Sequence, residues 1–191
     1  MATQPLTLLT EEEYLRIERA ALFKSEFVDG HMYAMAGGSP THSRLAVNAT
    51  VHLGAQLLES SCHLHSSDMR VRTPRGAQMY PDISGVCGED QLHPGTNDIL
   101  VNPVLVIEVS SPSTAVYDRG AKFELYRQIP TLREYLVIHQ ASIFAEHRRK
   151  NPDGTWVVLE YRGPAARIPL PAIGCELQLG SIYKGVLNDS E

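Results

Sequence analysis

The residue that most clearly points to chemistry is Glu108, the one acid inside the otherwise aliphatic run from Val104 to Val109. A continuous aliphatic run is typical of a central strand covered on both faces. A carboxylate there is costly to bury unless a partner holds its charge. Glu108 lies near the end of the run, before the break at Ser110-Ser111-Pro112, where a site can be built. A position paired with an arginine at the sheet edge is the alternative.

A second acid, Asp82, begins another predicted strand directly after Pro81, which fixes the backbone at that point. Taken alone, such an aspartate could equally be a turn residue. Two acids on adjacent strands can share a divalent cation, and hard oxygen ligands suit Mg²⁺ or Mn²⁺. The pair Asp82 and Glu108 therefore predicts a metal site.

Lys122 is the third residue of interest. Asp118, Lys122 and Tyr126 follow one another at a spacing of i, i+4, so they share one face of a predicted helix. An amine turned towards the carboxylates would stabilise a hydroxide or a developing phosphorane. An exposed salt bridge between Asp118 and Lys122 is the alternative.

Several elements must position these residues. Thr10 and Glu13 form a capping box that predicts a helix to about Arg19. Asp29-Gly30 predicts a hairpin turn within residues 24–35. Ser39 can cap, with Pro40 in the first turn, a helix from about 41 to 59.

The remaining elements follow in a regular order. Ser113 or Thr114 begins a polar turn, and a helix follows over about 117–128, ended by Pro130. The tail after 164 reads as irregular, with a short final strand or helix. The predicted strands are residues 63–73, 79–86, 103–109 and 132–139, and then a hairpin of 143–149 with 155–162. This order favours a mixed α/β fold.

Weaker candidates surround the main three. Glu26 is either an additional metal ligand or a structural acid. His42 lies on the apolar side of its helix, so it is either a core or capping histidine or a contact to phosphate or to a ligating carboxylate. Two basic clusters could face DNA or could be solvated strand ends. They are Arg70, Arg72 and Arg75, and then Arg148, Arg149 and Lys150.

Other constellations are incomplete. The serines at 110, 111 and 113 lack a Gly-x-Ser-x-Gly elbow, and Gly37-Gly38-Ser39 is not a phosphate loop. His63 and His65 could share one face of a strand, but no third ligand lies nearby in sequence, which disfavours a zinc site.

The composition sets the outer limits. A length of 191 residues suits one domain, and a net charge of −5 counts mildly against nonspecific DNA binding. No apolar run predicts a membrane span, and residues 1–10 do not look like a signal peptide. Three widely spaced cysteines argue against a disulfide framework and a structural zinc site, so we expect a cytoplasmic protein.

A family resemblance joins these motifs. The series Pro81-Asp82, then Glu108 to Thr114, then Asp118 through Lys122 to Tyr126 resembles the "Putative restriction endonuclease" family, formerly a domain of unknown function. That family belongs to the PD-(D/E)XK nuclease superfamily. The stretch from Lys24 to Gly30 resembles the family's N-terminal hairpin, and His42 resembles its helix start. The likeness covers about residues 7–139, and the Glu-Val-x-Ser-Pro-Ser-Thr stretch is its most specific part.

The resemblance implies a restriction-endonuclease-like core of helix, three strands, helix and strand at about residues 41–139. A helix and hairpin at 7–36 precede this core, and a hairpin and tail at 140–191 follow it, within one domain of residues 1–191. It also implies metal ligation by Asp82 and Glu108. The superfamily signature expects lysine where this chain has Ser110, so the family's lysine would come from the following helix as Lys122. Ser110, Asp118 and Tyr126 are then possible accessory residues.

Three functional hypotheses remain open. The first is Mg²⁺- or Mn²⁺-dependent hydrolysis of DNA, with the Val109 carbonyl as a further metal ligand and a homodimer for cleaving both strands. The second is an inactive nuclease fold that binds DNA or serves in assembly, which Ser110 and the net acidity favour. The third is a hydrolase acting on RNA or nucleotides.

Overall fold

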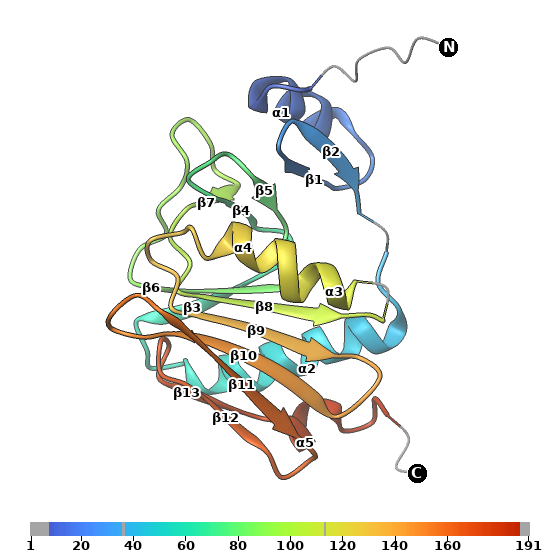
Figure 1. Ribbon diagram of the computed structural model, residues 1–191, viewed down its shortest axis with the longest axis vertical. Coiled ribbons are helices and arrows are strands. Elements are labelled where there is room, and N and C mark those ends of the chain that lie inside the picture. The colour runs from blue at the N-terminus through green and yellow to red at the C-terminus, as the bar shows by residue number, and fades with distance from the viewer. Residues whose placement is uncertain (1–7, 36, 113, 188–191) are drawn as a thin grey trace.

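The computed structural model describes residues 8–35, 37–112 and 114–187, and within them three sheets pack with the helices (Figure 1). The fold is mixed α/β, as the element order predicted. No helix among these residues is both long and apolar enough to cross a membrane. Ser113, which the sequence placed at a polar turn, lies outside the described residues.

The central sheet has six strands in the order β11-β10-β9-β8-β6-β3. β8 and β9 are parallel and the other neighbours are antiparallel. All six residues of β8 are buried, as its aliphatic sequence predicted. The strands are β3 (Cys62–Ser66), β6 (Ile83–Cys87), β8 (Leu105–Ser110), β9 (Glu134–His139), β10 (Phe144–Lys150) and β11 (Trp156–Arg162).

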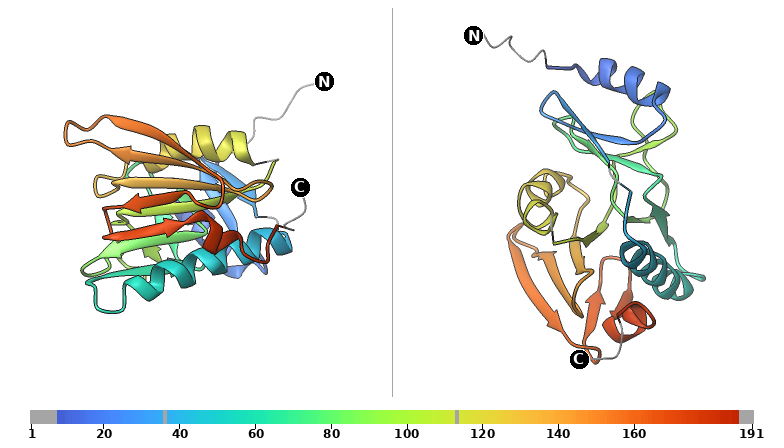
Figure 2. Two further views of the ribbon diagram at one scale, coloured as in Figure 1. Left: turned by 90° about the horizontal axis from the view of Figure 1, so that it is seen from below. Right: turned by 90° about the vertical axis from the view of Figure 1, so that its right-hand side faces the viewer.

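Helices cover both faces of this sheet (Figure 2). The helix α2 (Pro40–Gln56) lies on one face, where Leu45, Ala49 and Leu53 are buried. Ser39 caps it and Pro40 opens it as predicted, but it ends at Gln56 rather than near residue 59. On the other face a helical segment follows β8. It consists of α3 (Ala115–Tyr117), the π-helical turn η1 (Asp118–Lys122) and α4 (Phe123–Tyr126).

A smaller five-stranded sheet, in the order β2-β1-β5-β4-β7, packs beside the first. The helix α1 (Glu11–Ala20) begins with the predicted capping box of Thr10 and Glu13. Asp29 and Gly30 both have positive φ, which a tight turn between two antiparallel strands requires. The strands are β1 (Ser25–Val28), β2 (His31–Ala34), β4 (Arg70–Arg72), β5 (Gln78–Met79) and β7 (Ile99–Leu100).

Two segments that the sequence presented as single strands are each divided between the two sheets. Residues 63–73 break at a turn around Ser67 and Asp68, and residues 79–86 break at Pro81 and Asp82. Proline lacks the N–H that a strand interior needs, so the second break falls where pairing would otherwise continue. Asp82 therefore lies at a crossing between sheets, directly before β6.

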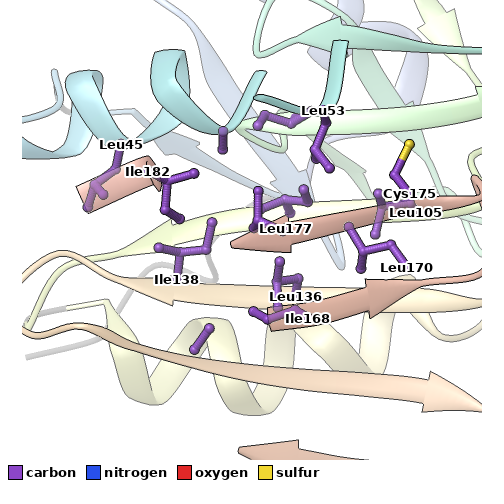
Figure 3. Packing of buried hydrophobic residues seen from close by; sticks show 14 of the residues in the cluster. Leu45, Leu53, Leu105, Leu136, Ile138, Ile168, Leu170, Cys175, Leu177 and Ile182 are labelled. Atoms are coloured by element: carbon purple, nitrogen blue, oxygen red, sulfur yellow. The ribbon is translucent and has the colours of Figure 1, made fainter. Parts of the chain in front are cut away.

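The C-terminal region is more regular than the sequence suggested. β12 (Arg167–Leu170) and β13 (Cys175–Gln178) form a hairpin, and α5 (Leu179–Tyr183) follows it. Their apolar side chains, including Ile168, Leu177 and Ile182, join the core between α2 and the central sheet (Figure 3). This core packs against one face of the central sheet, and Glu108, described below, lies on the other face.

The expectation that no disulfide forms was wrong. Cys62 and Cys87 are directly paired in the register of β3 and β6, with Cα atoms 3.9 Å apart, and their sulfurs are bonded. The two cysteines are 25 residues apart in sequence, so their spacing did not indicate that they are neighbours on adjacent strands. The bond also removes the cysteine-based argument for a reducing compartment. Cys175 is buried as a free thiol.

Candidate metal centre

The register of β6 and β8 brings the two predicted acids together. Ile83 pairs with Ile107, so the next position outward sets Asp82 beside Glu108. Ile83 and Ile107 both point into the core beneath α2. Because side chains alternate along a strand, Glu108 faces the other side, where it contacts Lys122 of η1. Asp82 lies directly before β6, and its charge acts on Glu108, so the structure brings the two predicted acids near one another.

Asp82 is fixed by two contacts. One carboxylate oxygen accepts a hydrogen bond from the Val109 N–H at 2.7 Å, and the same oxygen lies 3.2 Å from Nε2 of His42. The hydrogen bond to Asp82 raises the pKa of His42, although burial works against it. His42 is thus neither a core nor a plain capping residue; it pairs with the predicted metal-binding aspartate.

Lys122 points into the site as the functional interpretation required. Its amine lies 2.9 Å from Glu108 Oε1 and 3.1 Å from Glu26 Oε1, and only 8% of the side chain is exposed. Burial alone would lower the pKa of Lys122, but the charges of Glu108, Glu26 and Asp118 outweigh burial and raise it. The alternative of an exposed salt bridge to Asp118 is excluded by this burial.

Glu26 reaches the site from the smaller sheet. It lies on β1, which pairs with β5 through Phe27 and Gln78, and Glu26 Oε1 also accepts the Tyr80 N–H at 3.3 Å. Tyr80 directly follows β5 and precedes the Pro81-Asp82 crossing. One backbone amide thus ties Glu26 to the segment that carries Asp82, a link that no sequence pattern indicated.

The charges of Glu26, Asp82 and Asp118 all act on Glu108, and we call these four residues the acid cluster. Burial raises the pKa of Glu108 well above its usual value, and Asp82, Asp118 and Glu26 raise it further, while Lys122 offsets part of the effect. Burial likewise raises the pKa of Asp118, again partly offset by Lys122. Lys122 and His42 are the basic groups that contact these acids through the ion pairs described above. The site therefore holds more carboxyl groups than basic partners.

The helical segment that supplies Asp118 and Lys122 is a π turn, with α-helix before and after it. Such turns occur mostly as single insertions in α-helices and are frequent at functional sites. Tyr135 donates a hydrogen bond to the Asp118 carbonyl at 2.7 Å, which supports the widened turn from β9. The predicted face survives, since Asp118, Lys122 and Tyr126 are all buried.

The other predicted accessory residues are placed as follows. Ser110 is buried two residues after Glu108 in β8, so both point to the same face. The Lys122 amine lies on this face beside Glu108. The buried hydroxyl of Tyr126 has its pKa raised by burial and by the charges of Glu108 and Glu26. Val109 contributes its N–H to Asp82.

The arginine cluster predicted to contact DNA does not form a free basic surface. Arg70 is 2% exposed, and its guanidinium binds Glu18, Gln78 Oε1 and the Tyr80 hydroxyl. Arg72 makes a two-point contact with Glu11. Arg75 is exposed. Arg70 is instead a buried residue of β4, inside the smaller sheet.

Two surface clefts reach the acid cluster from different directions. One lies between the β1–β2 hairpin and the helical segment, and its lining includes Glu26, Tyr33, Tyr117 and Leu125. The other runs along α2, and its lining includes His42 and Asp82. Tyr33 and Tyr117 are 53% and 39% exposed, so aromatic surface adjoins the acids on one side. The sequence analysis did not single out either tyrosine.

Two relatives match this chain over most of its length. "Uncharacterized protein slr1290" of Synechocystis sp. (strain ATCC 27184 / PCC 6803 / Kazusa) is 36% identical over 184 residues, covering 95% of each chain. "Uncharacterized protein sll1609" of the same organism is 35% identical over 169 residues, covering 88% of this chain and 96% of its own.

A solved structure has the same fold. It is described as a "putative nuclease belonging to DUF820" from Anabaena variabilis ATCC 29413, and it matches with a TM-score of 0.77 at 15% sequence identity. The match covers 94% of this chain and 99% of that one. The family model Uma2, described as "Putative restriction endonuclease", matches residues 11–180. This match covers most of the sequence, including the helical segment that carries Lys122. The chain therefore belongs to the Uma2 family.

Proposed function

We propose that this protein is a divalent-metal-dependent nuclease that hydrolyses phosphodiester bonds in DNA. The observation that carries the proposal is the proximity of Asp82 and Glu108 at the end of the β6–β8 pairing, with the Lys122 amine 2.9 Å from Glu108 Oε1. Membership of the restriction endonuclease family supports the same reaction class. The proposal therefore rests on the chemistry of these residues as well as on the fold.

The residues present fit a hard divalent cation. The acid cluster offers carboxylate oxygens, the ligands that Mg²⁺ and Mn²⁺ prefer. The raised pKa values of Glu108 and Asp118 reflect burial and neighbouring negative charge that a cation would offset. Asp82 and Glu108 would hold the ion, with the Val109 carbonyl as a further ligand. When bound, such an ion polarises a phosphate oxygen and lowers the pKa of a coordinated water.

The chain's own residues then position the reaction. Lys122 directs its ammonium group into the site, where it can orient the attacking water and offset charge on the phosphate in the transition state. Glu26 also holds Lys122, with its Oε1 3.1 Å from the amine. His42 and the Val109 N–H hold Asp82, so the carboxylate is oriented before substrate arrives.

A plasmid-nicking assay with Mg²⁺ or Mn²⁺ tests the proposal. We expect Asp82→Asn and Glu108→Gln each to abolish cleavage, because each removes a charged ligand. We expect Lys122→Met to lower the rate about 10²- to 10³-fold, the usual effect of removing a group that stabilises transition-state charge. The matched control is Glu160→Gln, an exposed acid on β11 paired with Arg162.

Cleavage that persists unchanged in both acid variants would contradict the site. Calorimetry then separates an active nuclease from an inactive fold that serves in DNA binding or assembly. Binding of Mg²⁺ or Mn²⁺ that is lost in Asp82→Asn supports the metal centre, whereas no binding favours the inactive module. Sedimentation of the protein with and without a duplex tests the proposed homodimer.

The cleft beside Glu26 favours a second candidate, hydrolysis of single-stranded nucleic acid. Exposed aromatic rings stack on unpaired bases without sequence preference, and Tyr33 and Tyr117 line this cleft. A panel of single- and double-stranded DNA and RNA oligonucleotides decides between them. Tyr117→Ala should weaken cleavage of single strands more than cleavage of duplex DNA if the rings receive unpaired bases.

A further inference from the structure

A second cluster of ligating side chains lies on the edge strand of the central sheet. In β3, His63 pairs with Val86 and His65 pairs with Ser84 of β6. The two histidines are two residues apart, so both rings project from the same face of the sheet. Cys62 and Leu64 point the other way, against the core beneath α2. The sequence analysis disfavoured a zinc site here because it saw no third ligand.

The structure supplies that ligand from the loop after β6. Asp90 Oδ1 lies 2.9 Å from Nε2 of His63 and 3.0 Å from Nε2 of His65. The three ligating atoms all lie within 4.8 Å of one another. We propose that His63, His65 and Asp90 bind a Zn²⁺ ion, a site separate from the acid cluster and independent of the proposed nuclease activity.

The spacing of the three atoms suits tetrahedral zinc. With Zn–N and Zn–O bonds of about 2.0–2.1 Å, neighbouring ligands in a tetrahedron lie about 3.3 Å apart. The two imidazole nitrogens already stand close to that distance from the carboxylate oxygen. The rings therefore need only small displacements to admit an ion. Their centroids are 5.1 Å apart in an edge-to-face arrangement, so the rings are not stacked on each other.

The backbone around these ligands is held in place on both sides. Asn102, which is 6% exposed, donates its amide to the Glu89 carbonyl and accepts the Gln91 N–H, so it clamps the residues either side of Asp90. The Cys62–Cys87 bond joins β3 to β6 one residue before His63. Such supporting contacts orient ligands and strengthen metal sites.

The ligand types distinguish this site from the acid cluster. Two imidazoles and one carboxylate suit Zn²⁺, whereas Mg²⁺ prefers oxygen ligands alone. The side chains of His63 and Asp90 are 43% and 31% exposed, so a fourth coordination position opens to solvent. Three protein ligands with one open position differ from the four protein ligands of a closed structural zinc site.

Zinc titration of the tag-free, chelator-treated full chain tests this proposal, with excess Mg²⁺ present to saturate the acid cluster. We expect one Zn²⁺ per chain. Affinity should fall at least about tenfold in His63→Ala and His65→Ala, since even residues that only support a ligand contribute that much. Bound Co²⁺ should show the visible absorption bands of tetrahedral nitrogen coordination, and these should disappear in the double variant.

The controls are His31→Ala, an exposed histidine on β2, and Glu108→Gln in the acid cluster, and both should bind zinc as the wild type does. Asp90→Asn provides a ligand change in an exposed loop, where loss of fold is not expected, and circular dichroism checks each variant. Wild-type protein that binds no zinc in excess Mg²⁺ would overturn the proposal. Zinc affinity that stays within about twofold in the double histidine variant would overturn it equally.

Discussion

Two clusters of buried charge lie on either side of Tyr80, and they differ in how their charges balance. In the first, which we call the Arg70 cluster, Arg70 binds Glu18, Gln78 and the Tyr80 hydroxyl. The Tyr80 hydroxyl also donates to Glu18 at 2.6 Å. Asp98, which pairs with Arg19, lies 3.7 Å from Arg70, so two cations meet two anions and neutral groups complete the hydrogen bonding. In the acid cluster, four carboxylates face one lysine and one histidine.

The difference separates charges that hold the fold from charges that await a ligand. A buried ion pair with complete hydrogen bonding is costly to break from one side. An excess of like charge, by contrast, lowers stability and raises the affinity for a cation. Tyr80 connects the two clusters, since its side chain belongs to the first and its N–H holds Glu26 in the second.

The largest effect should come from breaking the balanced cluster. Arg70→Met leaves the Glu18 carboxylate buried without its cation, and we expect the free energy of unfolding to fall by about 3–5 kcal/mol. Urea denaturation measures this loss. Arg127→Met, which breaks an exposed pair with Glu124, should cost less than about 1 kcal/mol. A loss below about 1 kcal/mol for Arg70→Met would remove the contrast.

The acid cluster should respond to metal as the Arg70 cluster does not. A cation that binds only the folded state adds about 2.7 kcal/mol at a concentration one hundred times its dissociation constant. We therefore expect Mn²⁺ or Mg²⁺ to raise the melting temperature of the wild type but not of Asp82→Asn. Melting curves with metal and with EDTA measure the shift. An equal rise in both proteins would place the metal elsewhere.

Removing one acid should stabilise the metal-free protein. The pKa of Glu108 is raised in the folded state, so Glu108 contributes stability at pH below about 4.5 that is lost as the pH rises through the folded value. Glu108→Gln has no ionisable group at this position and does not lose stability in this way. We expect its free energy of unfolding at neutral pH to exceed that of the wild type by on the order of 1 kcal/mol. The gain should vanish in acid. Unfolding measured across pH tests it, with Glu124→Gln as the control that should show no gain.

The smallest effect concerns a well-paired acid near the surface. Hydrogen bonds from Arg72 lower the pKa of Glu11 despite partial burial. The stability that Glu11 contributes is therefore present above about pH 4.5 and lost as the pH falls through its lowered value. Glu11→Gln should cost less than about 1 kcal/mol at neutral pH, and the difference should close in strong acid. A gain instead of a cost would show that Glu11 behaves like Glu108.

Local signals in the sequence predicted local structure well. The capping residues Thr10 and Ser39, the turn at Asp29-Gly30 and the buried acid in β8 all act through neighbours within a few positions. For the same reason, the sequence of β8 alone was enough to single out Glu108 as a buried acid. The order of helix, three strands, helix and strand also appears in the structure as α2, β3, β6, β8, the α3–α4 segment and β9.

What the sequence did not reveal depends on contacts between distant segments. The alternation of residues 63–73 indicates a strand but not that Arg70 leaves one sheet and enters another. The pairing of Cys62 with Cys87 and the approach of Asp90 to His63 depend on the register of β3 and β6. The approach of Glu26 to Lys122 depends on how the smaller sheet packs against the larger.

The π turn at Asp118–Lys122 means that the direction of the Lys122 amine depends on how many residues the helix contains. An α-helix turns by about 100° per residue, so deleting Gly120 would swing everything after it around the axis by roughly that angle. Lys122 would then leave the carboxylates even though every side chain of the site remained. Replacing residues one at a time cannot expose this dependence. Relatives that are one residue shorter at this point would have to present their lysine from a different position.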